Sequence, residues 1–193
     1  INFAVLVASL IVASTPLVLA ALGELIVEKS GVLNLGVEGM MIIGAVAGFI
    51  VGVETGSAYI GMMAAAVAGA LLSLLFAFII LIMQANQVAS GLALTIFGLG
   101  IAALMGHPYT GIKSPQISTI SIPILNEIPI IGTMFFQHDL IVYISLISVL
   151  VIWYFLNRMR AGLILRSVGE DHDVAHSLGY RVITIRFLAI VFG

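Results

Sequence analysis

The residues best placed to do chemistry in this apolar chain lie in the stretch 28–41, which contains Asn34, Glu38 and three glycines beside or within an apolar run. An ionisable side chain inside a membrane segment costs about 3 kcal/mol, so it normally faces a cavity or a polar partner. Asn34 and Glu38 are four residues apart, and they share a face if the stretch is helical. Two interpretations of Glu38 stay open: it lines a permeation pathway, or it caps or bridges neighbouring helices.

Glycines interrupt the same stretch at Gly31, Gly36 and Gly39. Glycine is the residue that most readily leaves helical geometry. Irregular backbone is tolerated inside a membrane only where it lines a cavity or is packed in protein. The spacing therefore predicts a broken or re-entrant element near residues 30–41.

A second polar group lies in the turn 84–91, which is rich in amides and carries no charge. Its side chains could hydrogen-bond across helices or line the inner end of a pathway, and a solvated turn is the plainer interpretation. With the first group, it supplies the residues assigned to a substrate pathway: Asn34, Glu38, Gln87 and Ser90.

The pair His172 and His176 has the four-residue spacing with which two histidines bind zinc from one helical face. The metalloprotease pattern requires a glutamate between them as the general base, and this chain has Asp173 next to His172 instead. No third ligand is evident nearby. We expect solvated histidines and no metal site.

Other catalytic signatures are missing from the sequence. It has no Gly-x-Ser-x-Gly elbow, no phosphate-binding Gly-x-x-x-x-Gly-Lys loop and no cysteine. We expect a protein that is not an enzyme and binds no cofactor. If ATP hydrolysis drives its activity, another chain must supply it.

The segment 157–186 is long for a simple connector and holds five of the seven basic residues. Its middle reads as a short capped helix, with Asp171 as N-cap and Gly179 just beyond the end. Val174 and Leu178 form a small apolar stripe on it. Such a helix suits docking to a partner protein. A helix lying on the membrane surface is the alternative, against which the acidic residues at its start count.

The composition fixes the class of protein that positions these residues. Hydrophobic residues make up 62% of the 193 residues and charged residues only 8%, against about a quarter charged in soluble domains. Only helices and closed barrels span lipid, and apolar runs that are continuous rather than alternating argue against a barrel. We predict an all-α polytopic membrane protein embedded in lipid. The net charge of −2 gives no basis for nucleic-acid binding.

Apolar runs predict a single transmembrane domain over residues 1–193. Both ends look truncated, so we expect a fragment of a longer protein. Because loops rich in Lys and Arg stay cytoplasmic, the segment 157–186 is expected inside, with an outer loop at 107–139 and a short inner turn at 23–29. A short interfacial helix is expected near residues 134–137. The predicted spans are 3–22, 34–53, 58–83, 88–106 and 140–156, with another starting at 187.

Small residues recur every four positions in two of these spans. Such rows form one helix face and let backbones approach closely in lipid, so we expect them to pack helices tightly. The rows are Gly44, Gly48, Gly52 and Gly56, and Gly61, Ala65, Gly69 and Ser73.

Three stretches, in this order, resemble the permeases of bacterial ATP-binding-cassette importers for sugars, nucleosides and branched-chain amino acids. Residues 30–40 (SGVLNLGVEGM) resemble the family's early Gly-Asn-Leu-Gly motif, and residues 87–98 resemble its following inner turn and span. Residues 160–170, continuing to 176–179, resemble its cytoplasmic coupling segment. The Leu-Gly-Val-Glu-Gly form favours the nucleoside branch. An acid at Glu24, near an inner helix end, departs from the neutral residue expected there.

The resemblance implies a permease in the bacterial cytoplasmic (inner) membrane. Its implied partners are ATPase subunits that hydrolyse the ATP, a second permease, homologous or identical, and an extracellular or periplasmic solute-binding protein. Simple sugars or branched-chain amino acids are alternative substrates, and an ion-coupled secondary transporter is an alternative class. The residues expected to couple to the ATPase are Gly169, Glu170, Val174, Ala175, Leu178 and Gly179.

Overall fold

The computed structural model describes residues 3–115, 119–121 and 137–193. Five of its helices are long and apolar enough to cross a membrane, which confirms the all-α polytopic fold. They are α1 (Phe3–Lys29), α2 (Val37–Thr55), α3 (Ala58–Ala77) with its π-helical continuation η1 (Phe78–Ile82), α4 (Gln87–Gly106), and α6 (Leu140–Arg158).

Three shorter helices follow α6. Two of them, α7 (Arg160–Glu170) and α8 (His172–Ser177), lie in the segment 157–186 predicted to couple to a partner. The third, α9 (Val182–Phe192), begins in that segment and continues through the residues predicted to start another span at 187. The region predicted as an outer loop contains the short helix η2 (His107–Tyr109) and two strands that pair antiparallel, β1 (Thr119–Ser121) and β2 (Gln137–Asp139). The interfacial helix expected near 134–137 lies outside the described residues, apart from Gln137 in β2.

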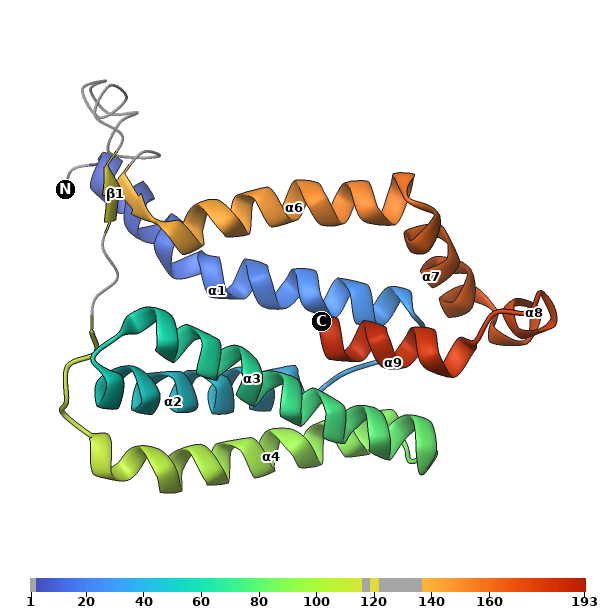
Figure 1. The fold of residues 1–193 in the computed structure, drawn as a ribbon, viewed down its shortest axis with the longest axis horizontal. Helices are drawn as coiled ribbons and strands as arrows, with labels where there is room; N and C mark the ends of the chain where they lie inside the picture. The colour runs from blue at the N-terminus through green and yellow to red at the C-terminus, as the bar shows by residue number, and fades with distance from the viewer. Residues whose placement is uncertain (1–2, 116–118, 122–136) are drawn as a thin grey trace.

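The helices form two groups that lie side by side (Figure 1). In one group α2 packs on α3 and α4, and in the other α1 packs on α6 and α9. Contacts between α3 and α9 join the groups. A hydrophobic core lies between the two groups and contains side chains from both: Val27 from α1, Phe76 from α3, Leu94 from α4 and Ile190 from α9. The helices α7 and α8 lie together at one end of the molecule.

The first helix is longer than predicted. The span expected to end at residue 22 continues to Lys29, so the predicted inner turn at 23–29 is helical. A glycine inside a helix costs about 1 kcal/mol but does not end it. Gly23 instead brings α1 close to the backbone of Gly193 at the end of α9. The helix ends just before Gly31, which has the left-handed φ of 81° that commonly follows a helix end.

Small residues hold α2 against α3, as their spacing predicts. A Cβ atom on Gly48 would lie 2.9 Å from the Gly61 carbonyl oxygen and 2.9 Å from the Ala65 Cβ. Not every member of the rows takes part: Gly56 lies beyond the end of α2 at φ 66°, and nothing lies within 4 Å of a Cβ on Gly69. The rows therefore pack helices only where they face each other.

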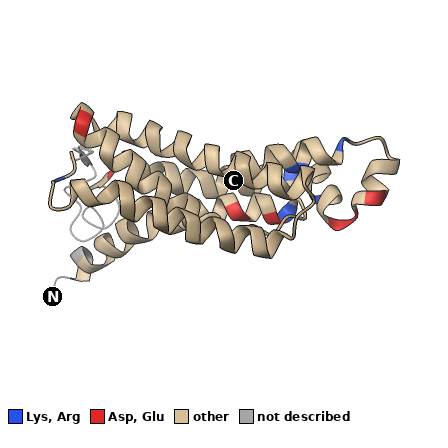
Figure 2. Cartoon of the chain, turned by 90° about the horizontal axis from the view of Figure 1, so that it is seen from below, with Lys and Arg blue, Asp and Glu red and all other residues tan. Residues whose placement is uncertain are grey.

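Charges gather toward the ends of the bundle and leave a long apolar stretch between them (Figure 2). Six of the seven basic residues lie at the end that holds α7 and α8. These six are Lys29, Arg158, Arg160, Arg166, Arg181 and Arg186.

Candidate functional site

Between α1 and α2 the chain is not helical over residues 30–36, here called the extended segment. Its side chains alternate, with Ser30, Val32, Asn34 and Gly36 buried and the residues between them exposed. A period of two is the pattern of extended backbone, which applies here to residues 32–34 only, because turns at 30–31 and 35–36 flank them. The chain is thus non-helical over the first part of the predicted element at 30–41, whereas residues 37–41 belong to α2, and the non-helical residues present one face to the protein and one face outward.

Side chains from α4 hold the backbone of the extended segment. The Leu33 N–H donates to Gln87 Oε1 at 2.8 Å, and the Thr95 hydroxyl donates to the Leu35 carbonyl oxygen at 3.0 Å. An unpaired backbone group in hydrocarbon costs several kcal/mol, so non-helical chain at this depth needs such partners. Gln87, predicted to line a pathway, thus ties this segment to α4.

Asn34 is directed into the protein. It is only 3% exposed, its Oδ1 accepts a hydrogen bond from the Gly36 N–H at 3.0 Å, and its amide nitrogen lies 3.7 Å from the Met40 sulfur. Asn34 precedes the first residue of α2, whereas Glu38 lies on that helix and is exposed. Asn34 and Glu38 therefore do not share a helix face, because only Glu38 is in a helix, and their side chains have different surroundings.

Glu38 lies well inside the end of the bundle. A Cβ on the adjacent Gly39 would lie 2.7 Å from both the Leu94 carbonyl oxygen and the Thr95 Cα. At 1.5 Å per residue, Thr95 is about 12 Å along α4 from Gln87. Figure 1 shows the same offset, because α2 begins short of the end that α3 and α4 reach. An exposed carboxylate at this depth faces water or a polar partner rather than lipid. Ser90, the fourth pathway residue, is half-buried on α4.

Glu24 is a site residue whose role the sequence did not reveal. Its Oε1 accepts a hydrogen bond from the Asn34 N–H at 3.2 Å, which places the acid of α1 against the extended segment. Its Oε2 is buried and has no hydrogen-bond partner among the described residues. The available signal was the acid itself, which departed from the expected pattern inside an apolar run.

The helix α7 touches the start of the extended segment without side chains between the two backbones. A Cβ on Gly169 would overlap the Lys29 carbonyl oxygen and lie 2.9 Å from the Gly31 nitrogen. The Arg186 Nε, from α9, donates to the Ser30 carbonyl oxygen at 3.0 Å. Gly169, predicted to couple to a partner, therefore contacts the neighbourhood of the predicted pathway.

The short helix α8 has the predicted caps. Asp171 accepts hydrogen bonds from the N–H groups of Asp173 (3.0 Å) and Val174 (3.1 Å), and Gly179 adopts a φ of 87°. Val174 and Leu178 are 54% and 69% exposed, as a docking surface requires.

The other residues predicted to act in this region differ in their exposure and surroundings. Ala175 is 1% exposed and is buried within this chain, while Val174 and Leu178 face outward, so its assignment to partner contact stays a prediction. Glu170 is exposed at the end of α7. His172 lies 3.6 Å from Asp173, and the described residues contain no group of three or more potential metal ligands.

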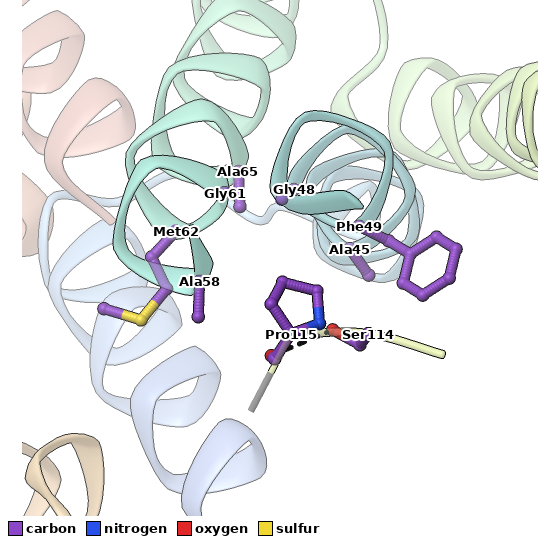
Figure 3. A pocket seen from close by; sticks show the side chains of 10 residues that line it. Ala45, Gly48, Phe49, Ala58, Gly61, Met62, Ala65, Ser114 and Pro115 are labelled. Carbon is purple, nitrogen blue, oxygen red and sulfur yellow. Dashed lines mark hydrogen bonds between the residues drawn. The ribbon is translucent and has the colours of Figure 1, made fainter. Parts of the chain in front are cut away.

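A small cavity of about 300 Å³ lies between α2 and α3, at a part of the molecule away from the extended segment. Figure 3 shows Phe49 from α2 and Met62 from α3 on its two sides, with Ser114 and Pro115 beside them. The size is at the lower limit for ligand pockets. Its lining offers few polar groups and includes none of the predicted site residues: Ala45, Gly48, Phe49, Gly52, Ala58, Gly61, Met62, Ala65, Ser114 and Pro115.

The family model described as "Branched-chain amino acid transport system / permease component" matches residues 6–193. The chain is 38% identical over 185 residues to the putative glucose ABC transporter permease protein TsgC13 of Haloferax volcanii, covering 94% of the chain and 56% of the relative.

Two nucleoside permeases are also similar. The chain is 34% identical over 204 residues to the guanosine ABC transporter permease protein NupQ of Bacillus subtilis, covering 98% of the chain and 63% of the relative. It is 31% identical over 200 residues to the nucleoside ABC transporter permease protein NupC of Lactococcus lactis, with the same two coverages. The chain thus spans less than two thirds of these relatives. No solved structure matches it.

Proposed function

The chain belongs to the family of permease components typified by branched-chain amino acid transport systems, and on that premise we propose that it is part of the membrane-spanning subunit of an ATP-binding-cassette importer for nucleosides or simple sugars. The relatives named for glucose, guanosine and nucleosides support these two substrate classes. The family description keeps branched-chain amino acids as the alternative. The protein acts in the cytoplasmic membrane.

The observation that carries the proposal is the extended segment inside an otherwise apolar helix bundle. Non-helical backbone at membrane depth is typical of transporters, where it lines a polar passage. The exposed carboxylate of Glu38 lies in the first turn of α2, directly after this segment. Glu38 and Ser90 therefore face the solute, and Asn34 and Gln87 hold the backbone that forms the wall.

ATP is hydrolysed by separate ATPase subunits that dock on α8 at the basic end of the bundle. The exposed apolar side chains of Val174 and Leu178 would enter a groove on the ATPase, while the capped helix keeps them at a fixed position. A second permease subunit completes the pathway. A solute-binding protein delivers substrate at the opposite end.

The test is uptake by the full-length permease, assembled with its ATPase and binding protein in proteoliposomes. Radiolabelled guanosine and glucose are offered separately, with and without ATP. We expect one of the two to accumulate only when ATP is present. Accumulation that requires an ion gradient and ignores ATP would contradict the proposal and favour the ion-coupled class, which Glu38 would serve as the coupling carboxylate. Accumulation of neither probe, with ATP-dependent uptake of leucine, would move the substrate to branched-chain amino acids.

A further inference from the structure

The extended segment is held from two sides by different parts of the fold. On one side it meets α7 and α9, through Gly169 and Arg186. On the other side its backbone is bound to α4, through Gln87 and Thr95. It is also the covalent link between α1 in one helix group and α2 in the other. A displacement of α7 relative to α4 must therefore act on these few residues.

The contact with α7 contains no compliant side chain. A Cβ on Gly31 would lie 2.9 Å from an Arg186 guanidinium nitrogen and 3.1 Å from the Gly169 Cα, and the φ of 81° already disfavours other residues there. Close-packed interiors transmit a displacement instead of absorbing it when no rotamer can adjust. The pair Gly31 and Gly169 thus joins α7 rigidly to the segment.

The hydrogen bond from Arg186 adds a directional tie to this contact. Its Nε donates to the carbonyl oxygen of Ser30, a residue with no exposed surface. The Ser30 hydroxyl in turn donates to the Val27 carbonyl oxygen at 2.6 Å, in the last turns of α1. Hydrogen bonds from a charged donor are about twice as strong as neutral ones. The guanidinium therefore holds the end of α1 to α9.

We propose that Arg186 is a positioning residue which, with Gly31 and Gly169, transmits movement of α7 and α8 to the extended segment and so opens or closes the pathway beside Glu38. The inference rests on the proposed function, because it needs an ATPase that moves α8. During transport the segment shifts against α4, and the contacts with Gln87 and Thr95 are the ones that change. Loss of the Arg186 tie leaves ATP hydrolysis running while less solute moves for each ATP hydrolysed.

Two substitutions separate the hydrogen bond from the rest of the side chain. Arg186→Gln places an N–H donor at the position of Nε, whereas Arg186→Met keeps a chain of similar length without any donor. Arg158→Met, at an exposed position at the end of α6, controls for the loss of one positive charge. All are made in the full-length permease and assembled with its ATPase and binding protein. Guanosine and glucose uptake and phosphate release are measured in the same proteoliposomes, together with the amount of ATPase bound.

With Arg186→Met, we expect solute transported per ATP hydrolysed to fall by about tenfold, the effect of one lost charged hydrogen bond, with ATPase binding unchanged. Arg186→Gln should restore the ratio to within about threefold of the unmodified protein, since a neutral hydrogen bond is roughly half as strong. An unchanged ratio in Arg186→Met, or an equal loss in both variants, overturns the inference.

A second variant guards against a simple folding defect. Gly169→Ala forces the α7 backbone away from Lys29 and should lower the same ratio, whereas Gly100→Ala, where nothing lies within 4 Å of the added atom, should not. A normal ratio in Gly169→Ala with normal assembly overturns the rigid junction. If the unmodified protein itself shows no ATP-driven uptake, the proposed function has failed, and that outcome is distinct from a failure of the Arg186 tie.

Discussion

The amide oxygen of Gln87 accepts a hydrogen bond from the backbone N–H of Leu33 at 2.8 Å, across 54 positions of sequence. The bond fixes extended chain against the first turn of α4. It replaces a bond that a continuous helix would have made internally, and Glu38 lies in the first turn of α2, well inside the bundle.

Replacing Gln87 by methionine should destabilise the protein. The change keeps the length of the side chain and removes the acceptor, at a cost of about 0.5–1.5 kcal/mol, because Leu33 is exposed and water can replace the lost acceptor. In a domain of this size each kcal/mol lowers Tm by about 2–4 °C. Thermal unfolding in detergent measures the shift. Val88→Met, at the exposed neighbouring position, should leave Tm within about 1 °C, because surface changes are usually small.

Alanine at Gly31 should cost more than alanine at Gly56. Both glycines have a left-handed φ, so both substitutions carry a conformational cost of about 1–2 kcal/mol. Only at Gly31 does the new methyl group also meet Arg186 and Gly169, since nothing lies within 4 Å at Gly56. The difference in free energy of unfolding between the two variants isolates the contact with α7. Equal losses would show that the contact contributes nothing.

Glu24→Gln should be tolerated better than Glu24→Leu. Glutamine keeps an oxygen for the Asn34 N–H, whereas leucine leaves that buried donor unpaired at a cost of about 1–3 kcal/mol. Glu28→Leu, one turn further along α1 and exposed, controls for loss of a carboxylate. Tm of the three variants decides the matter. A Glu24→Gln variant as unstable as Glu24→Leu would mean that the carboxylate charge is what the site requires.

Aspartates at Val174 and Leu178 together should prevent the ATPase from co-purifying. Both side chains are exposed and apolar, and burying a charge in a docking groove costs several kcal/mol. His176→Asp adds one of these charges about 160° around α8 from Val174, so it should retain the ATPase. Pull-down from solubilised membranes with the full-length permease compares the two. Unchanged co-purification of the double variant would contradict docking at α8.

Single cysteines across residues 32–38 should label with a period of two in the first part of this range. The 193 residues contain no cysteine, so each introduced thiol is the only one in this part of the protein. Positions 33, 35 and 38 should react with a membrane-impermeant thiol reagent, whereas 32, 34 and 36 should not, because they are buried. Uniform protection in every nucleotide state would remove this face from the pathway. Labelling that repeats every three to four residues, instead of every two, would contradict the non-helical conformation.

The sequence predicted the features that depend on local chemistry. Composition predicted the helical membrane fold, and Asp171 with Gly179 predicted the capped α8, because caps involve residues only a few positions apart. The glycines predicted a break after α1. Where α1 ends depends on packing with other helices, so the helix continues through Gly23, where a turn was expected.

The features that the sequence could not predict depend on residues far apart in the chain. The inward direction of Asn34 follows from the position of Met40 and from the break that precedes Val37, so the helical condition for a face shared with Glu38 does not hold. Ala175 lies on the same short helix as Val174, yet packing within the chain buries one and exposes the other. The contact of Gly169 with Gly31 has no local signature at all.

The contact between Gly31 and Gly169 also limits which segments can be exchanged between this protein and other transporters. Neither partner can be enlarged and compensated by trimming the other, since both already lack a side chain and each meets backbone. A coupling helix taken from a different transporter would fit only if it brought a glycine to the same place. Chimaeras made to accept a foreign ATPase should therefore exchange residues 30–36 together with α7 and α8, as one inherited unit.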